Sequence, residues 1–363
     1  MSLKNLLVIV FAASVITSCK KDDDTSQPSD VTYDRTEMLS YFSDSLIVYN
    51  YKNAWAAASA LTDNVAQLKA NTSAAAVTDF REQFEKVYLS WQLIAHLEFG
   101  PADNIGLKGN VNVYPTDTVQ INKNIELENY NLGTADNTDA KGLPAISYLL
   151  YGTGNSAEEV AAYFADNPKA INYIEVVIDD YINKISGIYN NWKDTYHAEF
   201  KSRKGTDAGS STSLLFNGLV LHTERFLRDG KIGIPAGKRT LGETLPEKTE
   251  NYYSGKSMPL AVANLKAIYR FFSATEKVSF YHYLHTLNAK YNGQLLADVV
   301  DAQFKTAIDK LEAIPDPLST TVDTNLPVID AAYAEIQKLI VLLKTDVPSA
   351  LGVLINYQDN DGD

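Results

Sequence analysis

The chain has 363 residues, and its 45 acidic against 32 basic side chains give a formal net charge of −13. This acidic balance, with no basic cluster along the chain, argues against nucleic acid and anionic lipid as partners. One hydrophobic core seldom suffices at this length, so the sequence predicts two packed units or one long bundle.

Residues 1–18 have the pattern of an export signal. Lys4 supplies a positive charge, and the apolar run 6–16 that follows is too short for a membrane-spanning helix, which needs about 20 residues. The length and flanks of this run are those of a cleaved secretory signal peptide.

The segment Ile16-Thr17-Ser18-Cys19 is similar to the lipobox of bacterial lipoproteins, in which the chain is cut before the cysteine and fatty acids such as palmitate are attached to it. Cys19 is the only cysteine, so no intramolecular disulfide can form. A plain signal peptide with a chance cysteine is the alternative. A lone exposed thiol is a liability in an oxidising compartment, so we predict that Cys19 is lipidated.

Residues 19–35 are predicted to form an acidic, hydrated tether, because Lys20-Lys21-Asp22-Asp23-Asp24 and the polar residues after it offer nothing that packs. The start of this tether is similar to short charged signals that send some lipoproteins to the outer membrane and its outer surface. We therefore expect a lipid anchor in the outer membrane, with residues 36–363 as a folded domain outside the cytoplasm.

Helical periodicity dominates the rest of the chain. Apolar residues recur every three or four positions over 80–95, 171–192, 296–311 and 329–343, and residues 38–68 are rich in Ala and Leu. No series of alternating strands appears. The predicted fold class is therefore all-α, as an antiparallel helical bundle.

Two long polar connections interrupt these helices. One covers residues 100–142, and the other consists of 201–211 and 230–257 on either side of a short predicted helix at 212–229. Loops of this length are usually functional or disordered. Their aromatic residues favour ordered packing against the bundle.

Four stretches, in chain order, carry a family resemblance: Trp91 through Glu98-Phe99-Gly100-Pro101; Tyr114-Pro115 followed by Asn122-Lys123-Asn124-Ile125-Glu126; Gly142 through Gly152; and Pro348 through the terminal Asp359-Asn360-Asp361-Gly362-Asp363. Together they resemble the imelysin-like family, also called insulin-cleaving membrane protease-like proteins, whose members are exported to the bacterial envelope and linked to iron uptake. The resemblance implies two related antiparallel helical-bundle halves, approximately 36–205 and 206–363, with the ligand site between them.

The family's signature, Gly-x-His-x-x-Glu, is altered in this chain. It is proposed to bind a metal, and its three positions correspond here to Gly142, Pro144 and Ser147. A His and a Glu three residues apart on one helix face can reach the same cation, whereas proline offers no ligand and a serine hydroxyl is a poor one. We therefore expect no catalytic residue, no bound metal and no other cofactor at this motif.

The resemblance also implies a pocket built from several segments. The segment Glu250 through Ser257 resembles the family's Glu-x-x-aromatic-Ser element in the second half. The candidate pocket residues, beside the 142–147 turn, are Trp91, Glu98, Tyr114, His222, Glu250, Tyr253 and Ser254.

Five histidines are the remaining candidates for metal ligands. His222 lies on an apolar stripe with Leu215, Leu219 and Phe226, so a hydrogen-bonded core histidine is favoured over a ligand. His282 and His285 have the spacing to share a metal, although a surface pair is the favoured interpretation. His96 and His197 lie among charges near helix ends, where solvated histidines are common.

The terminal Asp359–Asp363 segment resembles the start of a calcium-binding loop. The glutamate that such a loop places at its twelfth position is absent, so a structural role is favoured.

We expect a membrane-anchored, non-catalytic binding protein of the envelope, which takes a small ligand or an iron complex in iron or nutrient acquisition. A protein of the envelope is a further candidate partner. One alternative is an imelysin-type metallopeptidase, which needs about three protein ligands and a general base around an open metal position. Another is a pure interaction scaffold.

Overall fold

The computed structural model describes residues 33–357, and these residues form one compact unit. The predicted signal peptide, Cys19, most of the 19–35 tether and the Asp359–Asp363 segment lie outside the described residues. The described part is built almost entirely of helices, which confirms the predicted all-α fold class.

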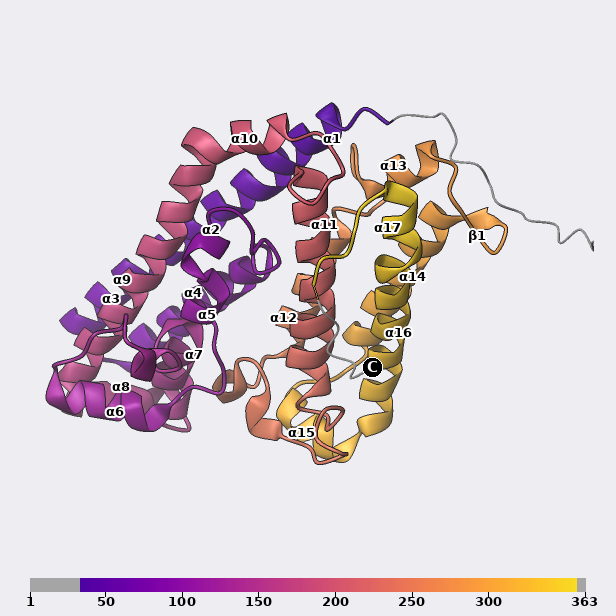
Figure 1. The fold of residues 1–363 in the computed structure, drawn as a ribbon. Coiled ribbons are helices and arrows are strands. Elements are labelled where there is room, and N and C mark those ends of the chain that lie inside the picture. The colour runs from indigo at the N-terminus through magenta and orange to yellow at the C-terminus, as the bar shows by residue number, and fades with distance from the viewer. Residues whose placement is uncertain (1–32, 358–363) are drawn as a thin grey trace, which may run out of the picture. The chain divides into compact units, whose positions relative to one another are not determined.

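Most of the helices before residue 203 lie together on one side of the unit, whereas α1 reaches from them toward the helices that follow residue 211 (Figure 1). α2 packs against α4 and α9, while α3 and α8 also contact α4. The isoleucines predicted to form one stripe of α9 are buried as expected. The elements are α1 (Thr36–Tyr41), η1 (Phe42–Val48), α2 (Tyr49–Ser59), α3 (Leu61–Ala70), α4 (Ala74–Gln92), α8 (Ala157–Asp166), α9 (Pro168–Asn191), η5 (Trp192–Tyr196) and α10 (His197–Ser202).

The connection 100–142 holds helices that the sequence did not reveal. The longest of them, α6, begins after Asp117, whose carboxylate accepts hydrogen bonds from the backbone N–H groups of Val119 and Gln120. The connection is ordered against the bundle, and α7 follows it. The elements are η2 (Asp103–Ile105), α5 (Leu107–Val111), α6 (Thr118–Leu127), η3 (Ala135–Asn137), α7 (Gly142–Ser147) and η4 (Tyr148–Gly152).

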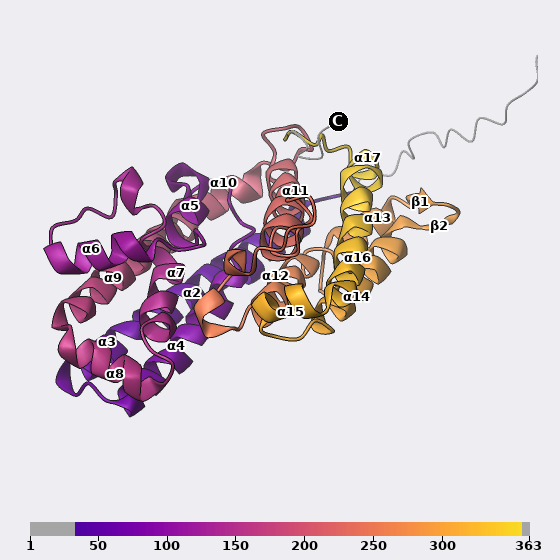
Figure 2. The ribbon, with the colours of Figure 1, turned by 90° about the horizontal axis from the view of Figure 1, so that it is seen from below.

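The second group of helices begins at residue 211 (Figure 2). α14 packs against α12, α13 and α16, and α12 also packs against α4 of the first group. The elements are α11 (Ser211–Leu221), η6 (His222–Gly233), η7 (Pro246–Lys248), η8 (Tyr252–Ser254), α12 (Met258–Tyr269), α13 (Phe280–Thr286), β1 (Lys290–Tyr291), β2 (Gln294–Leu295), α14 (Leu296–Glu312), α15 (Leu318–Thr324), α16 (Leu326–Lys344) and α17 (Asp346–Leu351). The two short strands pair antiparallel, with Lys290 opposite Leu295.

The helix predicted at 212–229 is longer than expected, because α11 continues without a break into the π-helical segment η6 and ends at Gly233. The apolar stripe predicted for Leu215, Leu219, His222 and Phe226 is buried except at Phe226. Phe226 is 37% exposed. Its ring nevertheless stacks on that of the buried His222, with 5.4 Å between the ring centroids, so the stripe continues to Phe226 and only this last residue is exposed.

Among residues 33–357, no helix combines the length and the apolar character that crossing a membrane requires.

Candidate functional site

Four of the predicted pocket residues line one cavity of about 700 Å³. Trp91 comes from the last turn of α4, Glu98 from the turns that follow it, Tyr114 from the link between α5 and α6, and His222 from the start of η6. The cavity thus draws residues from both groups of helices. Its volume lies within the range of about 300–1,000 Å³ that is usual for small-molecule sites.

Glu250 lies behind this cavity and is 1% exposed. Its carboxylate accepts hydrogen bonds from the side-chain amides of Gln92 (3.1 Å) and Asn112 (2.8 Å), and it forms an ion pair with the ammonium of Lys231. Asn112 and Lys231 both line the cavity. Buried charges are stable only when they are paired and hydrogen-bonded, so Glu250 fixes the positions of three side chains from distant parts of the chain.

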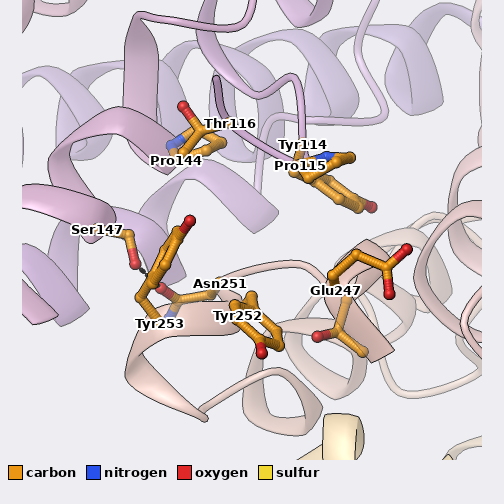
Figure 3. A pocket seen from close by; sticks show the side chains of 10 residues that line it. Tyr114, Pro115, Thr116, Pro144, Ser147, Glu247, Asn251, Tyr252 and Tyr253 are labelled. Carbon is orange, nitrogen blue, oxygen red and sulfur yellow. Dashed lines mark hydrogen bonds between the residues drawn. The ribbon is translucent and has the colours of Figure 1, made fainter. Parts of the chain in front are cut away.

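The motif-equivalent residues Pro144 and Ser147 line a second, much smaller pocket of about 60 Å³, together with Tyr253 (Figure 3). Tyr114 lines both pockets, so the two lie next to each other. Ser254 lines neither of them. Its hydroxyl donates to the backbone oxygen of Asn251 at 3.1 Å, which closes the turn at η8.

The residues of the altered motif do not fit a metal ion. Pro144 is buried in the first turn of α7, and its hydrocarbon ring carries no atom that could ligate a metal. The hydroxyl of Ser147 donates to Oδ1 of Asn251 at 2.7 Å, so its proton is engaged in a bond between α7 and the segment just before η8 (Figure 3). Within the described range, no group of three or more His, Cys, Asp or Glu side chains is arranged to hold a metal ion.

Gly142, the first residue of the motif, has a structural reason to be glycine. Its φ of +71° lies in the left-handed region, and a Cβ placed on it would come within 2.3 Å of the backbone oxygen of Val111. This close approach holds the start of α7 against the end of α5.

The prediction that His96 is solvated is wrong, because the turns after α4 fold it completely into the core. Its ring lies 6.1 Å from that of His222, centroid to centroid. Burial, reinforced by the positive charge of Lys108, lowers the pKa of His96 to about 3. Burial likewise lowers the pKa of His222, so both imidazoles are neutral at physiological pH.

His222 is a buried, hydrogen-bonded histidine, as the sequence favoured, but it also lines the cavity. Its Nε2 lies 2.9 Å from Oδ1 of Asn264, whose amide nitrogen donates to the backbone oxygen of Gln92. Because an amide oxygen only accepts, Nε2 carries the proton and Nδ1 is an acceptor. This Nδ1 has no hydrogen-bond partner among residues 33–357.

The other histidines contribute nothing to the cavity. His285 is exposed, while His282 is half-buried and its Nδ1 lies 3.0 Å from the hydroxyl of Ser279. His197 is half-buried, and its Nδ1 lies 3.0 Å from the backbone oxygen of Trp192.

Sequence reasoning missed the cationic side chains of the cavity, which are Lys108, Arg225, Lys231 and Lys248. Lys108 is the most unusual of them. Its ammonium lies 3.4 Å from the centroid of the Phe226 ring and 3.8 Å from the carboxylate of Glu98. Burial lowers the pKa of Lys108 to about 8, against the opposing effect of Glu98. A lysine whose pKa is so strongly perturbed beside a cavity marks a candidate functional site.

Residues 47–345 match the family model described as imelysin. A solved structure described as an iron-regulated protein A precursor from Parabacteroides distasonis is similar in fold, with a TM-score of 0.74 at 16% identity, over 87% of this chain and 94% of that chain. An imelysin-like protein from Psychrobacter arcticum superposes with a TM-score of 0.69 at 17% identity, over 89% of this chain and 97% of that one. No curated protein matches the chain.

Proposed function

The chain belongs to the imelysin family, and from that premise we propose that it is a membrane-anchored, non-catalytic protein of the bacterial envelope that binds a small ligand. The observation that carries the proposal is the cavity of about 700 Å³, on which segments from both groups of helices converge. The description of one structural relative as an iron-regulated protein precursor supports a place in iron or nutrient acquisition.

The non-catalytic part of the proposal rests on the donor atoms. A catalytic metal site needs about three protein ligands and an open position. Pro144 supplies no ligand, and the hydroxyl of Ser147 is engaged with Asn251. The carboxylate of Glu250 is already neutralised by Lys231. A metallopeptidase of the imelysin type is the alternative function, and metal content distinguishes the two.

We therefore expect residues 20–363, purified and dialysed, to hold much less than one equivalent of iron or zinc by mass spectrometry and to leave unfolded casein intact. The double substitution Pro144→His with Ser147→Glu restores the two side chains that share a cation and is expected to raise the metal content. Ser147→Glu alone is the matched control, since it supplies only one ligand. One tightly held metal ion per wild-type chain would contradict the proposal.

The anchor gives a separate prediction. Cys19 follows an apolar segment and a lipobox-like sequence, and it is the only cysteine of the chain. Several acyl chains contribute roughly 0.8 kcal/mol per buried CH₂, which makes the attachment effectively permanent. We expect Cys19→Ala to abolish incorporation of a clickable fatty acid in cells and to leave an uncut precursor. Ser18→Ala, which keeps a small residue before the cysteine, should label normally. Equal labelling of Cys19→Ala and the wild type would refute lipidation.

A further inference from the structure

The charges that line the cavity differ in sign from the chain as a whole. Four cationic side chains line it against the two carboxylates of Glu98 and Asp103, although the chain carries a net charge of −13. Glu250 neutralises Lys231 from behind, and Arg225 makes a further interaction of its own, so the placement of single groups, not the sum of the charges, decides what the cavity can bind.

Lys108 is the cation best placed to contact a ligand. Its pairing with Glu98 is loose, since the two charged groups lie 3.8 Å apart and Glu98 accepts instead from the backbone N–H of Lys108 at 3.1 Å. The ammonium rests over the ring of Phe226, which is itself a partly exposed wall of the cavity. An anionic group entering here would therefore meet a partly desolvated ammonium, where charge-assisted hydrogen bonds are strong.

Buried polar atoms without partners supply an independent indication of a ligand. Trp91 is 1% exposed, lines the cavity, and its indole N–H has no acceptor among the described residues. His222 likewise presents an unpartnered Nδ1. Buried polar groups in native proteins are nearly always satisfied, so such atoms beside a cavity point to a bound molecule that completes them.

The remaining walls are apolar. The rings of Tyr114 and Phe226, with the side chains of Val113, Leu221 and Ile234, line the same space. Flat aromatic walls of this kind favour a ligand with a flat apolar body, which stacks against them.

We propose that the cavity binds an organic anion whose acidic group contacts Lys108 and whose aromatic or similarly flat body packs against Tyr114 and Phe226. This inference rests on the proposed function, because it names the chemical class of the ligand for the same site.

Two dyes that differ by one charged group test the ligand class. 8-Anilinonaphthalene-1-sulfonate is an aromatic anion, and N-phenyl-1-naphthylamine has the same rings without the sulfonate. Residues 20–363 contain the whole compact unit and lack the apolar signal segment, so fluorescence titration needs no detergent. We expect one site for the anionic dye per chain, with an affinity at least about tenfold higher than that for the neutral dye, or about 1.4 kcal/mol.

A blocking variant locates the dye. A Cβ on Gly109, which lines the cavity, meets no atom within 4 Å, so Gly109→Trp should be tolerated and should fill the space. Gly187 in α9 is equally open and lies outside the cavity, which makes Gly187→Trp the matched control. We expect Gly109→Trp to abolish the site and Gly187→Trp to leave it unchanged.

A charge variant then tests the contact. Lys108→Met keeps most of the length of the side chain and removes its charge, and we expect it to weaken binding of the anionic dye about tenfold. Binding of the neutral dye should change little. Lys266→Met, at an exposed ion pair with Glu312, is the control and should affect neither dye.

The pH dependence gives a second readout of Lys108. The sulfonate stays charged throughout, and the imidazoles of His96 and His222 are neutral, so they do not titrate above pH 7. As the pH rises through about 8, Lys108 loses its proton and the affinity for the anionic dye should fall toward that of Lys108→Met. Glu98 and Lys231, the charged groups that act on Lys108, are present in both proteins, so the difference between the two reports Lys108 itself.

The outcomes separate the two proposals. If neither dye shows a site that Gly109→Trp removes, ligand binding in this cavity is refuted, and the ligand class with it. If both dyes bind there equally well and Lys108→Met changes neither affinity, the cavity binds ligands but the preference for an anion is wrong.

Discussion

Replacing Lys231 by methionine is expected to lower the free energy of unfolding by roughly 3–5 kcal/mol, because it leaves a buried carboxylate without its counter-charge. Lys231 and Glu250 are 5% and 1% exposed, so water cannot take over the role of the ammonium. Gln92 and Asn112 still donate to the carboxylate, but amide donors do not neutralise it. Urea denaturation of residues 20–363, followed by circular dichroism, measures the loss.

Substituting Glu250 together with Lys231 provides the control for this prediction. In the double variant Lys231→Met with Glu250→Gln neither member of this pair is charged, so much of the lost stability should return. Lys266→Met removes one side of an exposed ion pair, and such pairs contribute about 0–1 kcal/mol. A loss for Lys231→Met no larger than that for Lys266→Met would show that Glu250 does not depend on Lys231.

The helices that the sequence predicted are those whose buried face imposes a regular spacing. In α9 and α16 one face packs against the core along its whole length, so apolar residues must recur every three or four positions. Pro327, in the first turn of α16, also marks where that helix begins. The pattern and the structure agree here because packing alone determines both.

α6 escaped prediction because its apolar residues do not form one buried stripe. Ile121 and Ile125 face the core, whereas Val119 and Leu127 are exposed, so the four residues show no consistent period. The one usable signal was Asp117, which caps the first turn. In a stretch rich in Asn, Asp and Thr, such a cap is easily taken for a turn residue.

The cavity was only partly predictable for a different reason. The resemblance supplied Trp91, Glu98, Tyr114 and His222, all of which line it. Lys108 and Lys248 lie in polar connections where a lysine is expected to face solvent, and the ion pair of Lys231 depends on the fold around Glu250. Contacts between residues so far apart in the chain, such as the hydrogen bond from Gln92 to Glu250, cannot be predicted from the sequence around either residue.

Replacing Gly142 by alanine is expected to lower the free energy of unfolding by roughly 2–6 kcal/mol, since the left-handed backbone and the steric clash each cost about 1–3 kcal/mol. The new methyl group would lie 2.3 Å from the backbone oxygen of Val111, and a backbone atom cannot turn aside as a flexible side chain can. Relief requires α5 and α7 to separate. That movement would displace Pro144 and Ser147 and weaken the bond from Ser147 to Asn251.

Gly187→Ala is the matched control for this substitution. Gly187 lies within α9 with ordinary helical geometry and open space around its Cβ position, so alanine should be neutral or should stabilise the protein by about 0.5–1 kcal/mol. Urea denaturation gives the free energy of unfolding of both variants. The difference between the two values separates the need for glycine at position 142 from the general effect of adding a methyl group. If Gly142→Ala were as stable as Gly187→Ala, the close contact between α7 and α5 would not be the reason for glycine at the start of the motif.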